Sequence, residues 1–248
     1  MTPAEFQILE TVFLIVVASL LLLALPGYAW LRLSTQKNHM DQGDDTSPPV
    51  IQPFDLIIVG FYILVFTGSL KSAESKIENL EELQVTAGLV LVSSIASLSI
   101  GGIIPLILFW RTNLIEFFGL RWLRWKSIFW IMPAFVFAMM IILAILAACG
   151  WQTWVQDSFG AKPQEAVTLV KGASDLGLLV AMAVSAIIIA PIAEELIFRG
   201  YLYPVVKRFT DRWFASIFSG VFFGVIHFNV MGLPMLALMG IILAVIYE

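Results

Sequence analysis

Charged residues are missing from long stretches of this 248-residue chain. Five runs of 18 to 35 residues contain no Lys, Arg, Asp or Glu. A helix needs roughly 20 apolar residues to cross a bilayer, so each run is a candidate span. The composition agrees, because 60% of the residues are hydrophobic and only 13% are charged. The runs are Thr11–Leu31, Val85–Trp110, Ser127–Gln156, Leu176–Ala193 and Trp213–Tyr247.

Two further features raise the number of predicted spans from five to seven. The last run is long enough for two helices, and Asn229, Gly232 and Pro234 interrupt it with turn-forming residues. Residues 56–70 are also apolar, and they reach spanning length if residues 51–54 contribute. We therefore predict an all-α fold, a polytopic integral membrane helical bundle with about seven transmembrane helices.

The loops between the predicted spans suggest an orientation and a division of the chain. Nine Lys and Arg residues flank one side of the spans and four flank the other, which predicts an N-terminus outside the membrane. Residues 1–126 form the predicted N-terminal part, with a polar linker at 34–49 and an interfacial segment of aromatic and basic residues at 111–126. Residues 127–248 form the second predicted part.

The charge balance limits the classes of partner that the chain is expected to bind. A net charge of −4 and a pI near 5.2 leave no basic face for phosphate groups, so we expect no nucleic-acid partner. The lipid bilayer is the partner that the composition predicts.

Three ionisable residues lie inside an apolar sequence: Glu194, Glu195 and Arg199. Such groups cost several kcal/mol at membrane depth unless they are paired or hydrated, so they mark a candidate functional site. On a helix, Glu195 and Arg199 lie four residues apart and can neutralise each other. Glu194 is rotated by about 100° from Glu195 and remains available as a general base toward water.

His227 is a further ionisable residue within an apolar sequence, and Phe223 lies one helical turn before it. Glu194 and His227 are each about 16 residues from the polar turn at Thr210 and Asp211. In an antiparallel helix hairpin, both side chains should therefore reach the same depth. We predict that they hold one water molecule between them.

These residues resemble the CPBP (Abi) family of glutamic intramembrane proteases, which includes CAAX prenyl endopeptidases and bacteriocin-processing or immunity proteins. The family motif EExxxR matches Glu194, Glu195 and Arg199, and the motif FxxxH matches Phe223 and His227. The resemblance implies an intramembrane endopeptidase that cleaves a membrane-associated protein or peptide in the bacterial plasma membrane. It assigns water activation to Glu194 and His227, with Glu195, Arg199 and Phe223 in support and no cofactor.

One motif of that family is missing from the sequence. Family members carry a further His with an Asn four residues later, thought to stabilise the oxyanion, but no His follows His227 before the end at Glu248. We therefore expect that residues 127–248 are a protease-like domain truncated at its C-terminus, or that the chain is a degenerate homologue. Losing one oxyanion donor typically lowers turnover by a factor of about 100 to 1,000.

Other types of site fit the same residues less well. An HExxH zinc motif is absent, and the chain has only two His residues, although a metal site made of Glu and His stays open. The pattern also disfavours an aspartyl or serine protease and a transporter with repeated halves. A non-catalytic membrane immunity or scaffold protein is the alternative from another functional class.

Overall fold

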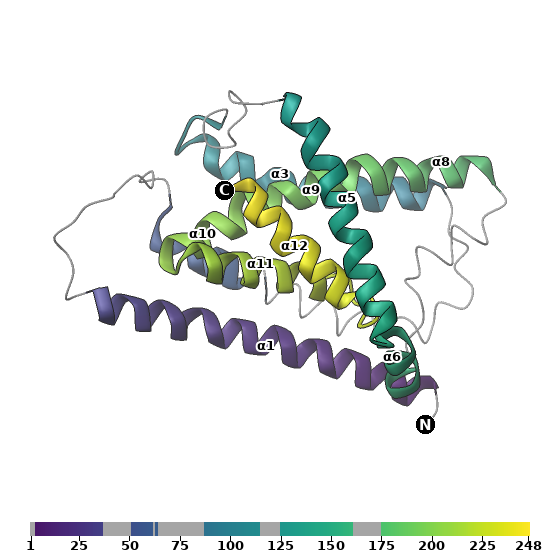
Figure 1. Cartoon of the computed structure of the whole chain (residues 1–248). Coiled ribbons are helices and arrows are strands. Elements are labelled where there is room, and N and C mark those ends of the chain that lie inside the picture. The colour runs from purple at the N-terminus through teal and green to yellow at the C-terminus, as the bar shows by residue number, and fades with distance from the viewer. Residues whose placement is uncertain (1–2, 37–50, 62, 64–86, 115–124, 161–174) are drawn as a thin grey trace.

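The computed structural model describes residues 3–36, 51–61, 63, 87–114, 125–160 and 175–248, and every regular element within these ranges is a helix (Figure 1). The predicted all-α fold of a membrane helical bundle is confirmed for these residues. The elements are α1 (Pro3–Gln36), α3 (Ala87–Phe109), α5 (Trp125–Ala148), α6 (Trp151–Phe159), α8 (Leu176–Val184), η2 (Ser185–Ile189), α9 (Ala190–Ile197), η3 (Phe198–Leu202), α10 (Tyr203–Phe209), α11 (Arg212–Val225) and α12 (Leu233–Tyr247).

Four helices in the described ranges are long and apolar enough to cross a membrane. They comprise Ile8–Arg32, Ala87–Phe109, Phe129–Ala148 and Leu176–Phe209. The shorter apolar helices α11 and α12 form the predicted pair with a turn between them. The predicted span 51–70 is helical at 53–61 and otherwise lies mostly outside the described residues, as do most of the linker 34–49 and of the segment 111–126.

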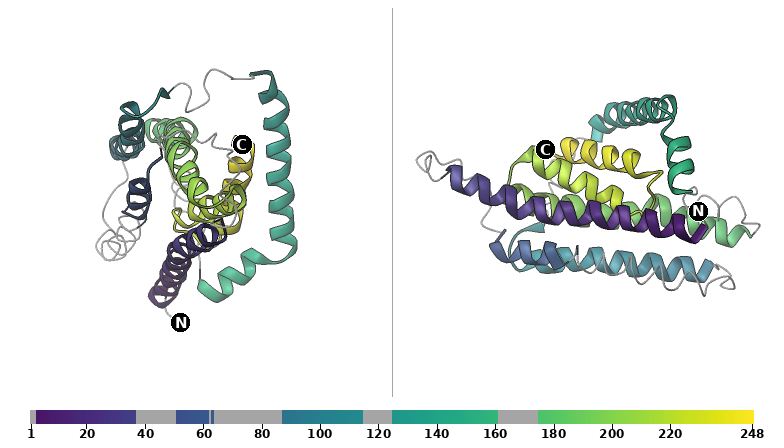
Figure 2. Two further views of the ribbon diagram at one scale, coloured as in Figure 1. Left: turned by 90° about the vertical axis from the view of Figure 1, so that its left-hand side faces the viewer. Right: turned by 90° about the horizontal axis from the view of Figure 1, so that it is seen from below.

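The helices are arranged in layers (Figures 1 and 2). α3 lies on one side of the molecule and α5 on the other, with α1, α11 and α12 between them. The contact between α3 and α9 is close, because a Cβ added at Gly101 would lie 3.2 Å from Ala193 Cα. Small residues allow such close approach of membrane helices, where packing replaces the hydrophobic effect.

Two predicted spans differ in extent from their charge-free runs. The run at residues 127–156 is not one helix, because Gly150 adopts φ 67° and separates α5 from α6. The run that begins at Leu176 continues as helix through the charged motif to Phe209. The absence of charge therefore marks an apolar environment more reliably than it marks the ends of a helix.

This long helix contains two π-helical turns, η2 and η3. The N–H of Ala190 reaches the carbonyl of Ser185, and the N–H of Tyr203 reaches the carbonyl of Phe198, each five residues back. Each donor directly precedes a proline, Pro191 or Pro204. Proline has no N–H for the regular bond to the residue four positions earlier, which favours a local change of register. Glu194 and Glu195 therefore lie on a short α-helical segment between two π turns, and Arg199 lies within the second of these turns.

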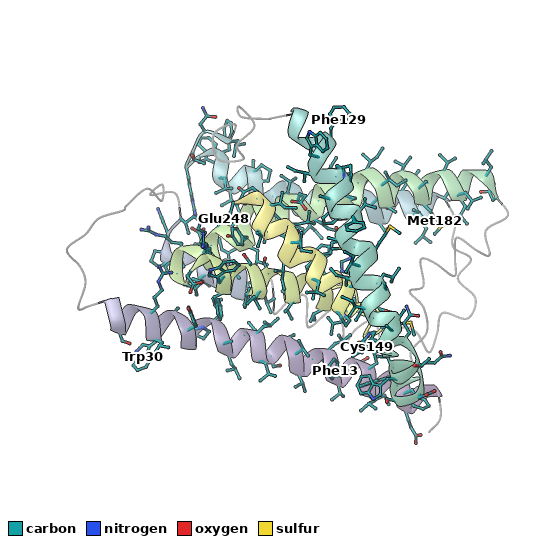
Figure 3. All side chains as sticks on the ribbon, viewed as in Figure 1. Phe13, Trp30, Phe129, Cys149, Met182 and Glu248 are labelled. Carbon is teal, nitrogen blue, oxygen red and sulfur yellow. The ribbon has the colours of Figure 1, made fainter. Side chains whose placement is uncertain are left out.

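Most of the outer surface is apolar, as expected for a bundle whose solvent is lipid. Trp30 is 73% exposed and Phe129 is 69% exposed. Figure 3 shows both side chains directed away from the other helices. The buried core lies mainly between η3, α10, α11 and the helix at 53–61, where Phe198, Phe222 and Phe223 are almost fully enclosed.

The contact between α11 and α12 depends on two glycines. A Cβ at Gly220 would lie 2.6 Å from the backbone nitrogen of Ile241 and 2.8 Å from the carbonyl oxygen of Ala237. Likewise, a Cβ at Gly240 would lie 2.8 Å from Gly220 Cα. No side chain fits at this crossing unless the backbones separate.

We expect the substitution Gly220→Ala to lower the free energy of unfolding by about 1–3 kcal/mol, because it overpacks a backbone contact. Thermal unfolding of the purified chain in detergent measures this change. Gly102→Ala is the matched control, since Gly102 is helical, exposed and has nothing within 4 Å of its added Cβ. Equal unfolding temperatures for the two variants would contradict the packing argument.

Candidate functional site

The structure brings Glu194 and His227 together. Glu194 Oε1 lies 3.9 Å from His227 Nε2, with Glu194 on α9 and His227 in the turn that follows α11. The side chains are 31% and 20% exposed, so the pair is only partly enclosed. The equal-depth argument from the sequence therefore predicted this proximity correctly, while the catalytic roles of the two residues stay a prediction.

The His227 ring is oriented by the preceding helix, α11. Nδ1 lies 2.7 Å from the carbonyl oxygen of Phe223, one turn earlier. A carbonyl can only accept a hydrogen bond, so Nδ1 must carry the proton. In the neutral ring, Nε2 is then the acceptor, and Nε2 is the nitrogen that faces Glu194. The motif FxxxH thus fixes which nitrogen is presented to the carboxylate.

Arg199 lies on η3 and is buried, with 3% of its side chain exposed. One Nη atom donates to the carbonyl oxygen of Gly240 on α12 at 3.2 Å. The guanidinium also lies over the rings of Phe223 and Phe198, at 5.5 and 5.9 Å from their centroids. Arg199 therefore joins η3 to both α11 and α12.

Glu195 forms the predicted ion pair with Arg199, at 3.4 Å between Oε1 and the second Nη atom. Glu195 is 49% exposed, unlike its partner. Solvent-exposed ion pairs contribute little, so we expect Arg199 to be held mainly by Gly240 and the two rings. As the helical geometry predicted, Glu195 and Glu194 have different partners.

Phe223 contacts both His227 and Arg199. Its side chain is 2% exposed, and its ring centroid lies 4.7 Å from that of His227 and 5.1 Å from that of Phe198. Its carbonyl orients His227, while its ring contacts the Arg199 guanidinium. The predicted supporting residue therefore contacts both halves of the site.

Sequence reasoning missed a second polar cluster. Asp55 is 1% exposed and accepts hydrogen bonds from Arg111 Nη1 and from the Tyr201 hydroxyl, each at 2.7 Å. Tyr201 lies on η3, two residues after Arg199, so this cluster anchors the π turn from the opposite side. The isolated carboxylate of Asp55 at the start of an apolar stretch was the available signal.

The described residues contain no group of three His, Cys, Asp or Glu side chains placed to share one metal ion. Glu194 and His227 could supply two ligands. A catalytic zinc ion usually takes three protein ligands, so this pair alone is an incomplete set.

Comparison with known protein families gives a match to residues 176–248, from α8 to the end of α12. The matched family is described as "Type II CAAX prenyl endopeptidase Rce1-like". Comparisons with curated proteins and with solved structures gave no match. The family resemblance drawn from the motifs is confirmed over these residues, which include both motifs. The match and the apolar helices together support an integral membrane protein; the N-outside orientation and the bacterial source stay predictions.

We expect nuclear magnetic resonance of the chain labelled with ¹⁵N-histidine to show one His locked with its proton on Nδ1, because Phe223 offers only an acceptor. His39 and His227 are the two histidines of the chain, so the spectrum holds two sets of signals. His227→Gln assigns them by removing one set. Observation of the Nε2–H form for His227 at neutral charge would contradict the arrangement.

Proposed function

We propose that this chain is an intramembrane endopeptidase that hydrolyses a peptide bond of a membrane-associated protein or peptide, with water activated by Glu194 and His227. One observation carries the proposal: an acceptor nitrogen of His227 faces a Glu194 oxygen at 3.9 Å, inside a segment that matches a prenyl endopeptidase family. The separation is too long for a direct hydrogen bond and suits one bridging water.

The geometry of such a water can be worked out from the separation. If the water oxygen lies about 2.8 Å from each acceptor, the 3.9 Å separation gives an angle of about 90° at the water. This is close to the angle between the two O–H bonds of water, so both hydrogens can be donated at once. The water lone pairs then point away from the acceptors, toward an incoming carbonyl carbon.

Hydrolysis follows from this arrangement. The water oxygen attacks the carbonyl carbon, one water proton moves to the Glu194 carboxylate, and the carbonyl electron pair moves to its oxygen. When the C=O bond re-forms, the C–N bond breaks and the proton on Glu194 passes to the leaving nitrogen. His227 accepts a hydrogen bond from the second O–H of the water and so holds its oxygen in position during the attack.

The remaining residues act as supports in this proposal. Arg199 holds η3 against α12 through Gly240 and so fixes the segment that carries Glu194. Phe223 orients His227. Glu195 lies beside the site at half exposure, where it balances the Arg199 charge. Preorganised partners of this kind keep a base and its water within the tolerances that catalysis requires.

We expect Glu194→Gln and His227→Ala each to reduce cleavage by about 10²–10⁴-fold, the range typical of general acid–base catalysis. The assay uses the purified chain in detergent with a farnesylated peptide that ends in a CAAX sequence. The same peptide without the prenyl group tests whether the lipid is required. Mass spectrometry of the released fragments locates the cleaved bond.

Asp157→Asn is the matched control, because it removes an exposed carboxylate on α6 and should leave the rate unchanged. Cleavage at the unsubstituted rate by either site variant would overturn the catalytic assignment. A non-catalytic membrane role would then be the better explanation of the same residues.

We further expect that a chelator such as EDTA leaves this cleavage unchanged, since the proposed water is held by two side chains. The rate is compared before and after dialysis against the chelator. Loss of cleavage that added zinc restores would contradict the metal-free proposal and assign Glu194 and His227 as metal ligands instead.

A further inference from the structure

The turn that carries His227 is held by parts of the chain far from it in sequence. This turn, residues 226–232, connects α11 to α12. Its own hydrogen bonds are short-range, such as the bond from the Gly232 N–H to Asn229 Oδ1 at 2.7 Å. Two further hydrogen bonds come from α1 and α6, which lie outside the segment that matches the protease family.

The first of these bonds involves Glu10 on α1. Glu10 Oε1 accepts a hydrogen bond from the backbone N–H of Val230 at 2.8 Å, across 220 positions of sequence. Glu10 lies among apolar residues near the start of a candidate span. Burying a carboxylate there costs free energy unless the carboxylate is paired or hydrogen-bonded. Its partner Val230 is fully buried, so this N–H depends on a protein acceptor.

The second bond involves Trp151 at the start of α6. Its indole Nε1 donates to the carbonyl oxygen of Met231 at 3.0 Å. Met231, the residue after Val230, is thus also hydrogen-bonded to a helix outside the turn. Consecutive backbone groups of the turn therefore bond to two different helices, one through an acceptor and one through a donor.

An apolar cluster surrounds these bonds. α1 contributes Leu14 and Ala18, α6 contributes Val155, and Val230 and Leu233 belong to the turn and the start of α12. All five side chains are buried, from 0% to 9% exposed. The turn is consequently packed as well as hydrogen-bonded against α1 and α6.

The backbone beside His227 needs this support. Phe228 adopts φ 50°, the only positive φ of a non-glycine residue within the described ranges. A bulky aromatic residue rarely occupies this left-handed region, and such a conformation persists when its surroundings enforce it. Phe228 and Asn229 are the two residues between His227 and Val230, so a release of the turn at Val230 would loosen the backbone next to His227.

We propose that Glu10 is a positioning residue for His227. Glu10 acts by accepting the hydrogen bond from the Val230 N–H, and Trp151 on α6 supports the same turn by donating to the Met231 carbonyl. The proposal rests on the proposed function, because it assigns the N-terminal helix a role in orienting the water-activating pair. In this arrangement, α1 is part of the catalytic architecture rather than an anchor alone.

The test is chemical labelling of His227 with diethylpyrocarbonate in the purified full chain in detergent. Mass spectrometry gives the ratio of His227 to His39 modification, with His39 as the internal reference. We expect Glu10→Ala to raise this ratio about fivefold, the effect of losing one hydrogen bond. Glu10→Gln keeps an acceptor oxygen and should restore the original ratio. Glu5→Ala, which removes an exposed carboxylate from the same helix, should leave it unchanged.

Trp151→Phe gives an independent arm if Glu10→Ala does not fold. It removes the indole N–H together with the five-membered ring, and we expect a rise in the ratio. Trp154→Phe removes the same atoms on the exposed face of α6 and should give no rise. An unchanged ratio in folded Glu10→Ala, or an equal rise in Glu10→Gln, would overturn the proposal, as would equal ratios for the two tryptophan variants.

Labelling needs no turnover, so this inference and the proposed function can fail separately. If the unsubstituted chain cleaves the farnesylated peptide, Glu10→Ala should lower kcat with little change in KM, and Glu10→Gln should recover it. A chain that cleaves nothing but shows the labelling pattern would refute the protease proposal while leaving the positioning of His227 in place.

Discussion

The close approach of α11 and α12 at Gly220 and Gly240 determines the geometry of the site. Because neither glycine has a side chain, the backbones meet and the Gly240 carbonyl comes within 3.2 Å of the Arg199 guanidinium. Phe223 then packs beside Gly240, under the same guanidinium, and presents its carbonyl to His227. A wider crossing would separate Arg199 from its acceptor. The ion pair with half-exposed Glu195 is too weak to compensate for that loss.

The site divides its polar groups by exposure. Arg199 is enclosed by aromatic rings and a backbone carbonyl, whereas Glu194 and His227 remain partly open. Enclosure suits a group that must not move, and openness suits groups that must meet water and a substrate. Within a bundle whose surface is largely apolar, Glu194 and His227 are thus accessible while the Arg199 cation stays buried.

Much of this arrangement could be predicted from local sequence patterns. The absence of charge located the membrane helices, and helical periodicity separated Glu194 from Glu195. Counting residues from the polar turn at Asp211 placed Glu194 beside His227. Each of these inferences uses the regular rise and rotation of a helix, which depend little on the rest of the fold.

The missed features depend instead on contacts between distant segments. The hydrogen bond between Asp55 and Tyr201 joins residues 146 positions apart, and the one between Glu10 and Val230 joins residues 220 positions apart. Local periodicity in the sequence does not predict such contacts. Glu10 and Asp55 were visible as acids in apolar surroundings, but their partners Val230, Tyr201 and Arg111 lie far from them in the sequence. The break at Gly150 had a local cue in the glycine itself, yet apolar composition on both sides concealed it.

The two π turns have a consequence for how the motif segment can vary. Each π turn holds one residue more than an α-helical turn would, and one residue corresponds to about 100° of rotation. Deleting a residue from η3 would therefore swing α10 around the helix axis relative to Glu194. The rotational position of Glu194 about the helix axis thus depends on one extra residue on either side of it, so we expect a change in length to disturb this helix more than a substitution does.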